Sequence, residues 1–218
     1  MIRTIIFDFD GVLAESVDIK TVAFGKLFEN EGAEVARKVV EYHIAHTGVS
    51  RYDKFRYFYR EFLGRELDDD TFRGLCRRFS ELVVDEVVKA PYVEGAKEFL
   101  EEHAARYRFY VASATPQEEI EEIVARRGMT KFFSRIYGAP TGKDAAVKDI
   151  LERDPVLPEE ALFVGDASSD MNAAAASDIH FVARIYEGNE DIFRSLGCAR
   201  IRAISELKDA ISVLEGQG

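Results

Sequence analysis

An apolar run near the start of the chain leads directly into two acidic residues and a glycine, with residues 5–11 reading IIFDFDG. Carboxylates are rarely buried without a partner, so Asp8 and Asp10 at the end of a buried strand require a nearby cation. Polar residues also follow later apolar runs, at Ser113, Lys143, Asp166 and Asp170. This recurrence predicts that segments far apart in the chain build one site.

The order of the apolar runs predicts an α/β fold. Short runs occupy residues 3–9, 109–113, 135–138, 161–165, 179–185 and 199–204, and helical patterns occupy residues 94–103, 116–128, 143–153, 169–176 and 206–215. Near-continuous apolar strands such as TIIF and LFVG are typical of parallel strands that helices cover on both faces. We therefore expect a doubly wound parallel sheet, a Rossmann-like core whose strand carboxyl ends share one edge.

A helical segment interrupts this alternation between about residues 16 and 90. Its apolar residues recur at helical spacing through four expected helices, and Thr71 is a candidate cap for the last of them. The aromatic residues within 52–62 are expected to fill the core of this segment. The sequence thus predicts a core domain of residues 1–15 and 91–218 and an inserted helical domain of residues 16–90, with hinges at 14–16 and 89–95.

Charge and cysteine content disfavour several classes of protein. A net charge of -11 over 218 residues argues against an extended nucleic-acid surface, which needs clustered Lys and Arg. Cys76 and Cys198 lie outside any CxxC spacing, which indicates neither a disulfide framework nor a zinc site. No apolar run approaches the roughly 20 residues that span a bilayer. We expect a cytoplasmic protein, monomeric or homodimeric, that binds neither nucleic acid nor membranes.

The acidic residues at the strand ends predict a metal site. Two carboxylates about 4 Å apart repel by roughly 4 kcal/mol at an effective dielectric near 20, so Asp8, Asp10 and Asp166 need more positive charge than Lys143 alone supplies. Oxygen ligands without histidine or cysteine favour Mg²⁺. His43 and His46 lie three residues apart, but no third ligand nearby completes a zinc site.

Four ordered segments resemble the motifs of the haloacid dehalogenase (HAD) superfamily. They are DFDGVLAES at 8–16, VASAT at 111–115, the lysine of TGKD at 141–144, and VGDASSD at 164–170. The helical insert after the first motif is similar to that superfamily's cap domain, in the branch of phosphoglycolate phosphatase and β-phosphoglucomutase. The second aspartate of the first motif, which the dehalogenases lack, implies phosphoryl chemistry.

The resemblance implies phosphoryl transfer that depends on Mg²⁺. Asp8 would attack phosphorus and become an aspartyl phosphate, while Asp10 would act first as acid and then as base. The implied metal ligands are Asp8, the Asp10 carbonyl, Asp166 and Asp170, the last bound directly or through its neighbours. The implied phosphate-binding groups are Ser113, the Ala114 amide and Lys143. The implied partner is a small phosphorylated molecule.

Substrate choice is expected to lie with the helical insert. The segment GVSR at 48–51 resembles a substrate-contacting loop of the β-phosphoglucomutase branch, which implies that Arg51 binds a second phosphate or a carboxylate; a solvated arginine at a helix end is the alternative. Where that branch has a histidine ten residues after the second aspartate, this chain has Lys20, a further candidate substrate-binding cation. We expect hydrolysis of a phosphomonoester, with a sugar-phosphate mutase and a phospho-acceptor signalling module as open alternatives.

Overall fold

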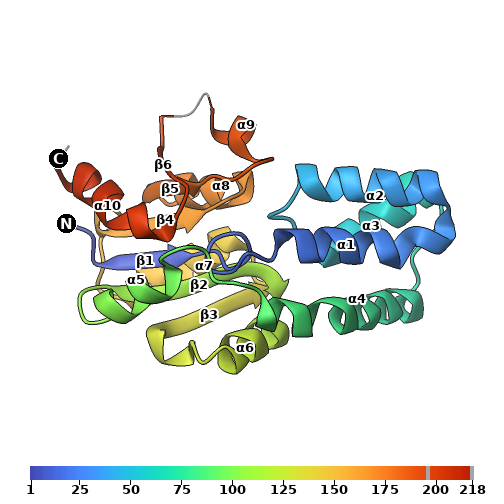
Figure 1. Ribbon diagram of the computed structural model, residues 1–218, viewed down its shortest axis with the longest axis horizontal. Coiled ribbons are helices and arrows are strands. Elements are labelled where there is room, and N and C mark those ends of the chain that lie inside the picture. The colour runs from blue at the N-terminus through green and yellow to red at the C-terminus, as the bar shows by residue number, and fades with distance from the viewer. Residues whose placement is uncertain (195–196, 217–218) are drawn as a thin grey trace.

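The computed structural model describes residues 1–194 and 197–216, which fold around one parallel sheet of six strands. The strands lie in the order β3-β2-β1-β4-β5-β6 (Figure 1). Their bounds are β1 Thr4–Phe7, β2 Arg108–Pro116, β3 Phe133–Ala139, β4 Ala161–Gly165, β5 His180–Arg184 and β6 Ala199–Ile201. Every neighbouring pair runs parallel, which confirms the predicted doubly wound α/β fold.

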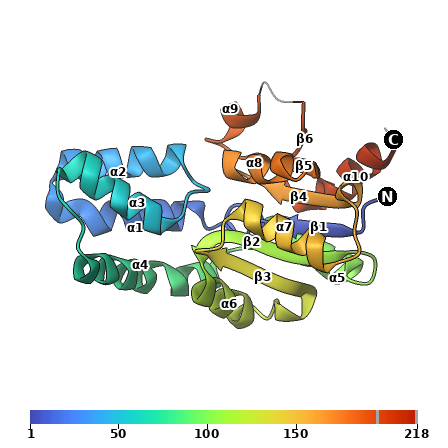
Figure 2. The same cartoon turned by 180° about the vertical axis from the view of Figure 1, so that it is seen from behind.

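Helices cover both faces of this sheet. On one face lie α5 (Ala96–His103), α6 (Gln117–Arg126) and α10 (Leu207–Gly216), in the core that contains Ile5 and Phe7 of β1. On the other face lie α7 (Lys143–Arg153) and α8 (Ser168–Ala176), in a second core that contains Ile6 (Figure 2). The short helix α9 (Glu190–Phe193) follows β5. Successive residues of β1 serve opposite faces, which explains why the whole strand is apolar.

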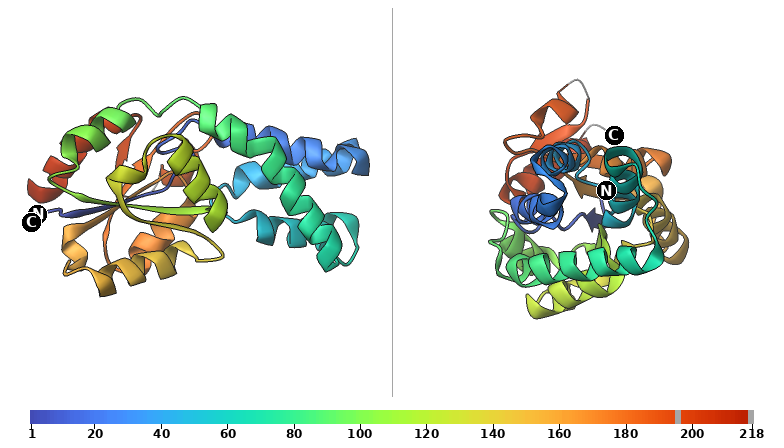
Figure 3. Two further views of the ribbon diagram at one scale, coloured as in Figure 1. Left: turned by 90° about the horizontal axis from the view of Figure 1, so that it is seen from below. Right: turned by 90° about the vertical axis from the view of Figure 1, so that its right-hand side faces the viewer.

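Four helices extend beyond the carboxyl ends of the strands, and we call residues 17–89 that carry them the helical insert (Figures 1 and 3). They are α1 Val17–Phe28, α2 Ala33–Ala45, α3 Arg51–Tyr57 and α4 Asp69–Lys89, with a π-helical turn at Phe58–Leu63. Phe24, Phe55 and Phe79 form a buried aromatic cluster, with the ring centroids of Phe24 and Phe79 4.4 Å apart. The division into two domains stays a prediction.

The cap of α4 differs from the prediction. Asp68, and not Thr71, precedes the first helical residue, and its Oδ1 accepts a hydrogen bond of 2.8 Å from the Thr71 backbone N–H. The Thr71 hydroxyl donates back to Asp68 Oδ2 at 2.7 Å. A carboxylate is the better cap because it both accepts the free N–H and interacts favourably with the positive end of the helix dipole.

Two strand ends also differ from the prediction, and both differences position the site. β1 ends at Phe7, so Asp8 is the first residue beyond the strand. β2 continues to Pro116, so Ser113 lies inside an irregular part of the strand, where the pairing with β3 shifts between Ala112 and Pro116. Across residues 1–194 and 197–216, no helix combines the length and apolarity needed to cross a membrane.

Candidate active site

Asp8 occupies the middle of the sheet edge because it directly follows a central strand. Its backbone N–H continues the sheet by donating to the Val164 carbonyl at 3.0 Å. The residue is 5% exposed, and its Oδ2 accepts a hydrogen bond of 2.7 Å from Lys143 Nζ, while Oδ1 accepts from the Phe9 N–H at 2.6 Å. The strand therefore holds a carboxylate in a buried position with one cation against it.

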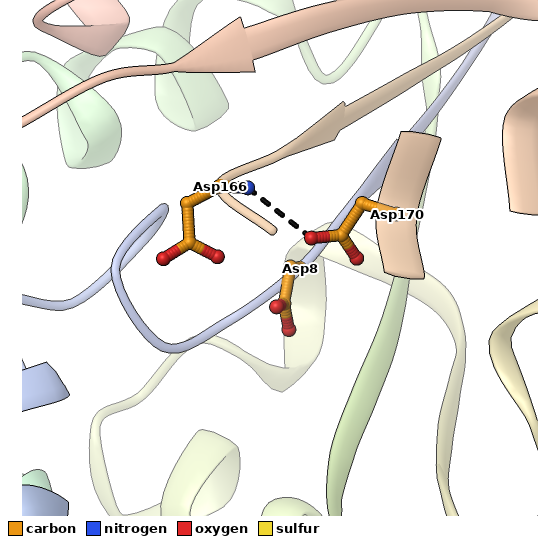
Figure 4. A group of neighbouring side chains, drawn as sticks. All are labelled: Asp8, Asp166 and Asp170. Carbon is orange, nitrogen blue, oxygen red and sulfur yellow. Dashed lines mark hydrogen bonds between the residues drawn. The ribbon is translucent and has the colours of Figure 1, made fainter. Parts of the chain in front are cut away.

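Two further carboxylates lie beside Asp8. Asp166 follows β4, the neighbour of β1, and Asp170 lies in the first turn of α8 (Figure 4). Oxygens of the three side chains lie within 4.8 Å of one another, and all three residues are buried. Asp170 Oδ2 is fixed by the backbone N–H groups of Asp166, at 3.2 Å, and Ala167, at 3.0 Å.

Lys143 is the only cation that contacts this acidic cluster within the described part of the chain. It begins α7, is 8% exposed, and donates to both Asp8 and Asp170. Burial alone would lower its pKa, but the two carboxylates raise it above the ordinary lysine value. One lysine thus partly neutralises three carboxylates, which leaves the cluster with excess negative charge.

Burial and this excess negative charge together raise the pKa values of carboxyl groups in the cluster. Burial raises the pKa of Asp8 to about 7, opposed by Lys143 and reinforced by Asp170 and Asp10. Burial, with Asp8 and Asp170 as neighbours, also raises the pKa of Asp166 well above its ordinary value. Three buried oxygen donors that share too little positive charge suit a hard divalent cation, and Mg²⁺ prefers such a set. The donor set therefore fits a magnesium ion.

A tight turn brings Asp10 back toward the sheet edge. Gly11 has φ +75°, the left-handed region that favours glycine, and its backbone lies against the acidic cluster. A Cβ at this position would lie 2.5 Å from Asp166 Oδ2, closer than van der Waals contact allows. The DFDG segment therefore requires glycine at position 11, because any side chain here would displace Asp166.

Asp10 contacts a different set of residues from Asp8. Its Oδ2 accepts hydrogen bonds from Lys20 Nζ at 2.5 Å and Thr115 Oγ1 at 3.0 Å, and its Oδ1 accepts from Ser16 Oγ at 2.6 Å. Burial would raise the pKa of Asp10, but the charge and hydrogen bond of Lys20 outweigh it and hold this pKa below its ordinary value. Asp10 is therefore an ionised carboxylate in this arrangement.

A cavity of about 40 Å³ lies between the sheet edge and the helical insert. Asp8, Asp10, Ser113, Ala114 and Asp166 line it from the sheet side. Lys143 lines a neighbouring cleft of about 410 Å³, which Ser113 and Ala114 also border. The structure thus brings together the residues that the sequence predicts from the four motifs.

Arg51 lies at this cavity but is already paired. Its side chain is 4% exposed, so the alternative of a solvated arginine is wrong. The guanidinium donates to both carboxylate oxygens of Glu119 on α6, at 2.8 and 2.7 Å, and to Ser80 Oγ at 3.1 Å. This ion pair joins the helical insert to α6, which covers one face of the sheet, and substrate binding by Arg51 stays a prediction.

The two histidines do not form a metal pair. His43 is buried, with its Nδ1 2.8 Å from Lys54 Nζ, whereas His46 is exposed and stacks on Tyr42 with ring centroids 4.0 Å apart. Over residues 1–194 and 197–216, the potential metal-binding group is the acidic one described above.

Several contacts at the site were not predicted from the sequence. Tyr186 Oη donates to Asp166 Oδ2 at 2.8 Å, and Asn189 Nδ2 donates to the Asp166 carbonyl at 2.9 Å. Thr115 and Ser16 bind Asp10, although both lie inside the segments that resemble HAD motifs. The segment after β5 has neither periodicity nor a motif, so nothing in the sequence marks Tyr186 or Asn189.

Comparison with solved structures places the fold among HAD-type proteins. A β-phosphoglucomutase from Clostridium difficile is 18% identical, with a TM-score of 0.79 over 100% of this chain and 98% of that one. A predicted phosphoglycolate phosphatase from Haemophilus somnus is 20% identical, with a TM-score of 0.75 over 95% and 97%. A Bacillus subtilis protein assigned as a HAD-hydrolase, solved bound to magnesium and showing interdomain movement, is 16% identical, with a TM-score of 0.69 over 98% and 99%.

Family membership follows from the sequence as well as from the fold. No curated protein matches the chain. The model of the haloacid dehalogenase-like hydrolase family matches residues 5–184, which include Asp8, Ser113, Lys143 and Asp166 at the site. The chain therefore belongs to the haloacid dehalogenase-like hydrolase family, and it is an enzyme of the hydrolase class.

Proposed function

We propose that this hydrolase is a Mg²⁺-dependent phosphatase that cleaves a small phosphomonoester through an aspartyl phosphate on Asp8. One observation carries the proposal: a buried carboxylate at the end of the central strand contacts Lys143 and lies within 4.8 Å of two further carboxylates. An anionic nucleophile meets an anionic ester only where positive charge offsets their repulsion. Lys143 and a bound metal ion would supply that charge.

The residues that would hold Mg²⁺ are the carboxylates of Asp8 and Asp166 and the backbone carbonyl of Asp10, with Asp170 beside them. When bound, the ion supplies positive charge to the phosphoryl oxygens and holds the ester against Asp8. Tyr186 and Asn189 fix Asp166 by donating to its carboxylate and its backbone carbonyl respectively. Such outer contacts orient a metal ligand, so both residues belong to the proposed metal site.

In the first step an Asp8 oxygen forms a bond to phosphorus while the bond from phosphorus to the ester oxygen breaks. Asp10 gives a proton to the departing alcohol. Ser113, the Ala114 amide and Lys143 hold the phosphoryl oxygens, and Ser113 is suited to this by its position in the cavity next to Asp8. In the second step Asp10 takes a proton from water, whose oxygen attacks phosphorus and releases Asp8.

The observed state of Asp10 corresponds to the base of the second step. Lys20, Ser16 and Thr115 all donate to its carboxylate, so it is ready to accept a proton. Acting as acid in the first step requires that Asp10 acquires a proton despite Lys20. Lys20 therefore favours the hydrolytic half of the cycle, since it stabilises the form that activates water.

A mutase of the β-phosphoglucomutase type is the second candidate, because the Clostridium difficile enzyme shares the fold and the chain has the GVSR segment. Two observations favour hydrolysis instead. Lys20 replaces the expected histidine and binds Asp10, and Glu119 occupies the Arg51 guanidinium that a second phosphate would need. Incubation with β-glucose 1-phosphate and a sugar bisphosphate separates the two: a mutase forms glucose 6-phosphate without net release of phosphate.

The proposal is tested by release of phosphate from p-nitrophenyl phosphate. We expect sustained turnover that requires Mg²⁺ and stops when EDTA is added. A single stoichiometric burst would contradict hydrolysis and favour a phospho-acceptor signalling module. Turnover that is unchanged by EDTA would contradict the metal requirement. A panel of phosphoglycolate, sugar phosphates and nucleotides then identifies the substrate.

A further inference from the structure

The last residue of β5 is a buried arginine whose side chain reaches the turn that follows β1. Arg184 is 7% exposed, and β4 separates its strand from β1. Its Nη1 donates to the Gly11 carbonyl at 3.3 Å, and its guanidinium binds the Glu15 carboxylate through Nη2 at 2.6 Å and Nη1 at 3.3 Å. One side chain thus holds both ends of residues 11–15, the turn that follows Asp10.

Hydrogen bonds within this turn make it compact. The Gly11 N–H donates to the Ala14 carbonyl at 2.8 Å, and the N–H groups of Leu13 and Ala14 donate to the Phe9 carbonyl at 2.9 and 3.1 Å. Residues 12–14 are buried. The turn is therefore one packed unit, and its position against the sheet depends on the contacts at its two ends.

Asp10 depends on this turn for its position. It lies directly before Gly11 in the chain, at one end of the turn. Ser16, whose hydroxyl donates to Asp10 Oδ1 at 2.6 Å, directly follows Glu15 at the other end. The two residues that Arg184 holds are therefore the chain neighbours of Asp10 and of one of its hydrogen-bond donors.

Arg184 is itself fixed by contacts with several segments. Its Nε donates to the Arg202 carbonyl at 3.2 Å, and its guanidinium carbon lies 4.9 Å from the centroid of the Tyr186 ring. The side-chain amide of Asn189 donates to the Arg184 carbonyl at 3.0 Å. A planar guanidinium that is held in this way orients its partners more precisely than a flexible ammonium group would.

We infer that Arg184 is a positioning residue for Asp10. Its contacts at both ends of the turn keep the Asp10 carboxylate where it can take a proton from the attacking water. This inference rests on the proposed function and adds a residue to it. Asp8 does not depend on the turn in this way, because its backbone N–H is bonded to β4. Loss of Arg184 should therefore impair the step that needs Asp10 as a base and spare the attack by Asp8.

The reaction with p-nitrophenyl phosphate separates these two steps, because its weakly basic leaving group departs without a proton from Asp10. Rapid quenching, followed by measurement of the phosphate bound to Asp8, gives a rate constant for each step. Arg184→Met should lower the rate constant of dephosphorylation at least about tenfold, since a general base contributes about 10²–10⁴-fold and a displaced base loses part of this. The rate constant of Asp8 phosphorylation should change less than about twofold.

Two further variants separate this role from a general loosening of the helical insert. Arg127→Met removes an arginine that donates to three backbone carbonyls at the C-terminal end of α4, and it should leave the ratio of the two rate constants unchanged. Glu15→Gln removes the charge of a side chain that is 42% exposed, so it is a milder change than Arg184→Met. It should lower the same rate constant, and thermal unfolding shows that each variant is folded at the assay temperature.

Several results would overturn the inference. Equal losses in the two rate constants of Arg184→Met would show that the arginine supports the fold as a whole. Unchanged dephosphorylation in folded Glu15→Gln and Arg184→Met would show that Asp10 keeps its position without them. The same selective loss in Arg127→Met would assign the effect to the insert. In each of these cases the wild-type protein still turns over p-nitrophenyl phosphate and the proposed function survives, whereas absence of wild-type turnover would overturn both proposals.

Discussion

The two sides of the cavity differ in how their charged residues are paired. On the sheet side, Lys143 binds Asp8 and Asp170 at the carboxyl ends of the strands. On the side of the helical insert, Lys20 and Arg51 reach across the boundary to Asp10 and Glu119, and Lys54 has no acidic partner among the described residues. The sheet side thus pairs its own charges around Asp8, while the insert contributes cations whose pairing depends on how it sits over the sheet.

This difference supports the proposal that chemistry and selectivity lie in different parts of the molecule. The proposed nucleophile must keep its position in every cycle, and a central strand holds Asp8 in place through backbone hydrogen bonds. A residue that selects the leaving group needs only to meet it when the insert covers the site. Gly48 supports such a cover, because a Cβ there would lie 1.9 Å from Ser169 Oγ, so the loop that begins α3 lies directly against α8.

Replacement of the nucleophile should have the largest effect. Asp8→Asn preserves shape but removes the anion that attacks phosphorus, so kcat should fall by about 10³-fold or more, equivalent to at least about 4 kcal/mol of barrier. The fold should survive, because the change removes a charge from a crowded acidic cluster. Steady-state kinetics and thermal unfolding measure the two properties. Activity above about a tenth of the wild-type value would contradict a nucleophilic Asp8.

Disruption of the ion pair between insert and sheet should have the next largest effect. Glu119→Gln leaves the buried Arg51 without its carboxylate, which should lower the free energy of unfolding by about 2 kcal/mol or more. Chemical denaturation measures the loss. The matched double variant Arg51→Met/Glu119→Leu removes both charges and should be much closer to wild type. Equal losses in the single and double variants would show that the charge pair is not the cause.

Binding of Mg²⁺ should depend on pH through the acidic cluster. The pKa of Asp8 is raised to about 7, so the folded protein without metal binds a proton more tightly than the unfolded chain does. Stability without metal should therefore fall as pH rises from the ordinary aspartate range to about 7. Mg²⁺ favours ionised carboxylates and should raise Tm more at about pH 8 than at about pH 5.

Thermal unfolding with and without Mg²⁺ at both pH values measures this dependence. Asp166→Asn serves as the matched control, since it removes one proposed ligand and should reduce the gain at high pH. A gain in Tm that is equal at both pH values would contradict the metal site.

The smallest effect is expected from the cation beside Asp10. Lys20 is the main group that holds the pKa of Asp10 low against burial, so Lys20→Met should raise that pKa. Asp10 would then ionise only at higher pH, and the acidic limb of the pH profile of kcat should move upward. An unchanged acidic limb would show that Lys20 does not control the base. Lys148→Met is the control, because Lys148 lies on the exposed surface of α7.

The sheet side of the site was the part that the sequence could predict. Apolar strands that end one residue before Asp8 and Asp166 determine both the sheet and the edge at which these residues meet, because parallel strands share one direction. The glycine at position 11 is then required, because a side chain there would collide with Asp166. Apolar periodicity alone does not mark Ser113 or Lys143, and both were predicted from the order of the four motifs.

The side of the insert was less predictable because its contacts join segments with unrelated local patterns. Glu119 lies on an otherwise ordinary acidic helix, and it meets Arg51 because α3 packs against α4 and α4 packs against α6. Lys54 resembles any lysine of an amphipathic helix until its burial is known. The cap of α4 shows the same limit at short range, since three successive acids precede Thr71 and the sequence does not select Asp68 among them.

The central claim is a covalent phosphoryl intermediate on Asp8 next to a metal ion, and a crystal structure with Mg²⁺ and beryllium trifluoride tests it most directly. Beryllium trifluoride mimics a phosphoryl group on a carboxylate. The account predicts beryllium joined to an Asp8 carboxylate oxygen, fluorides near Ser113 and Lys143, and Mg²⁺ contacting Asp8 and Asp166. Beryllium bound at another residue, or an Asp8 side chain directed away from both ions, would contradict it.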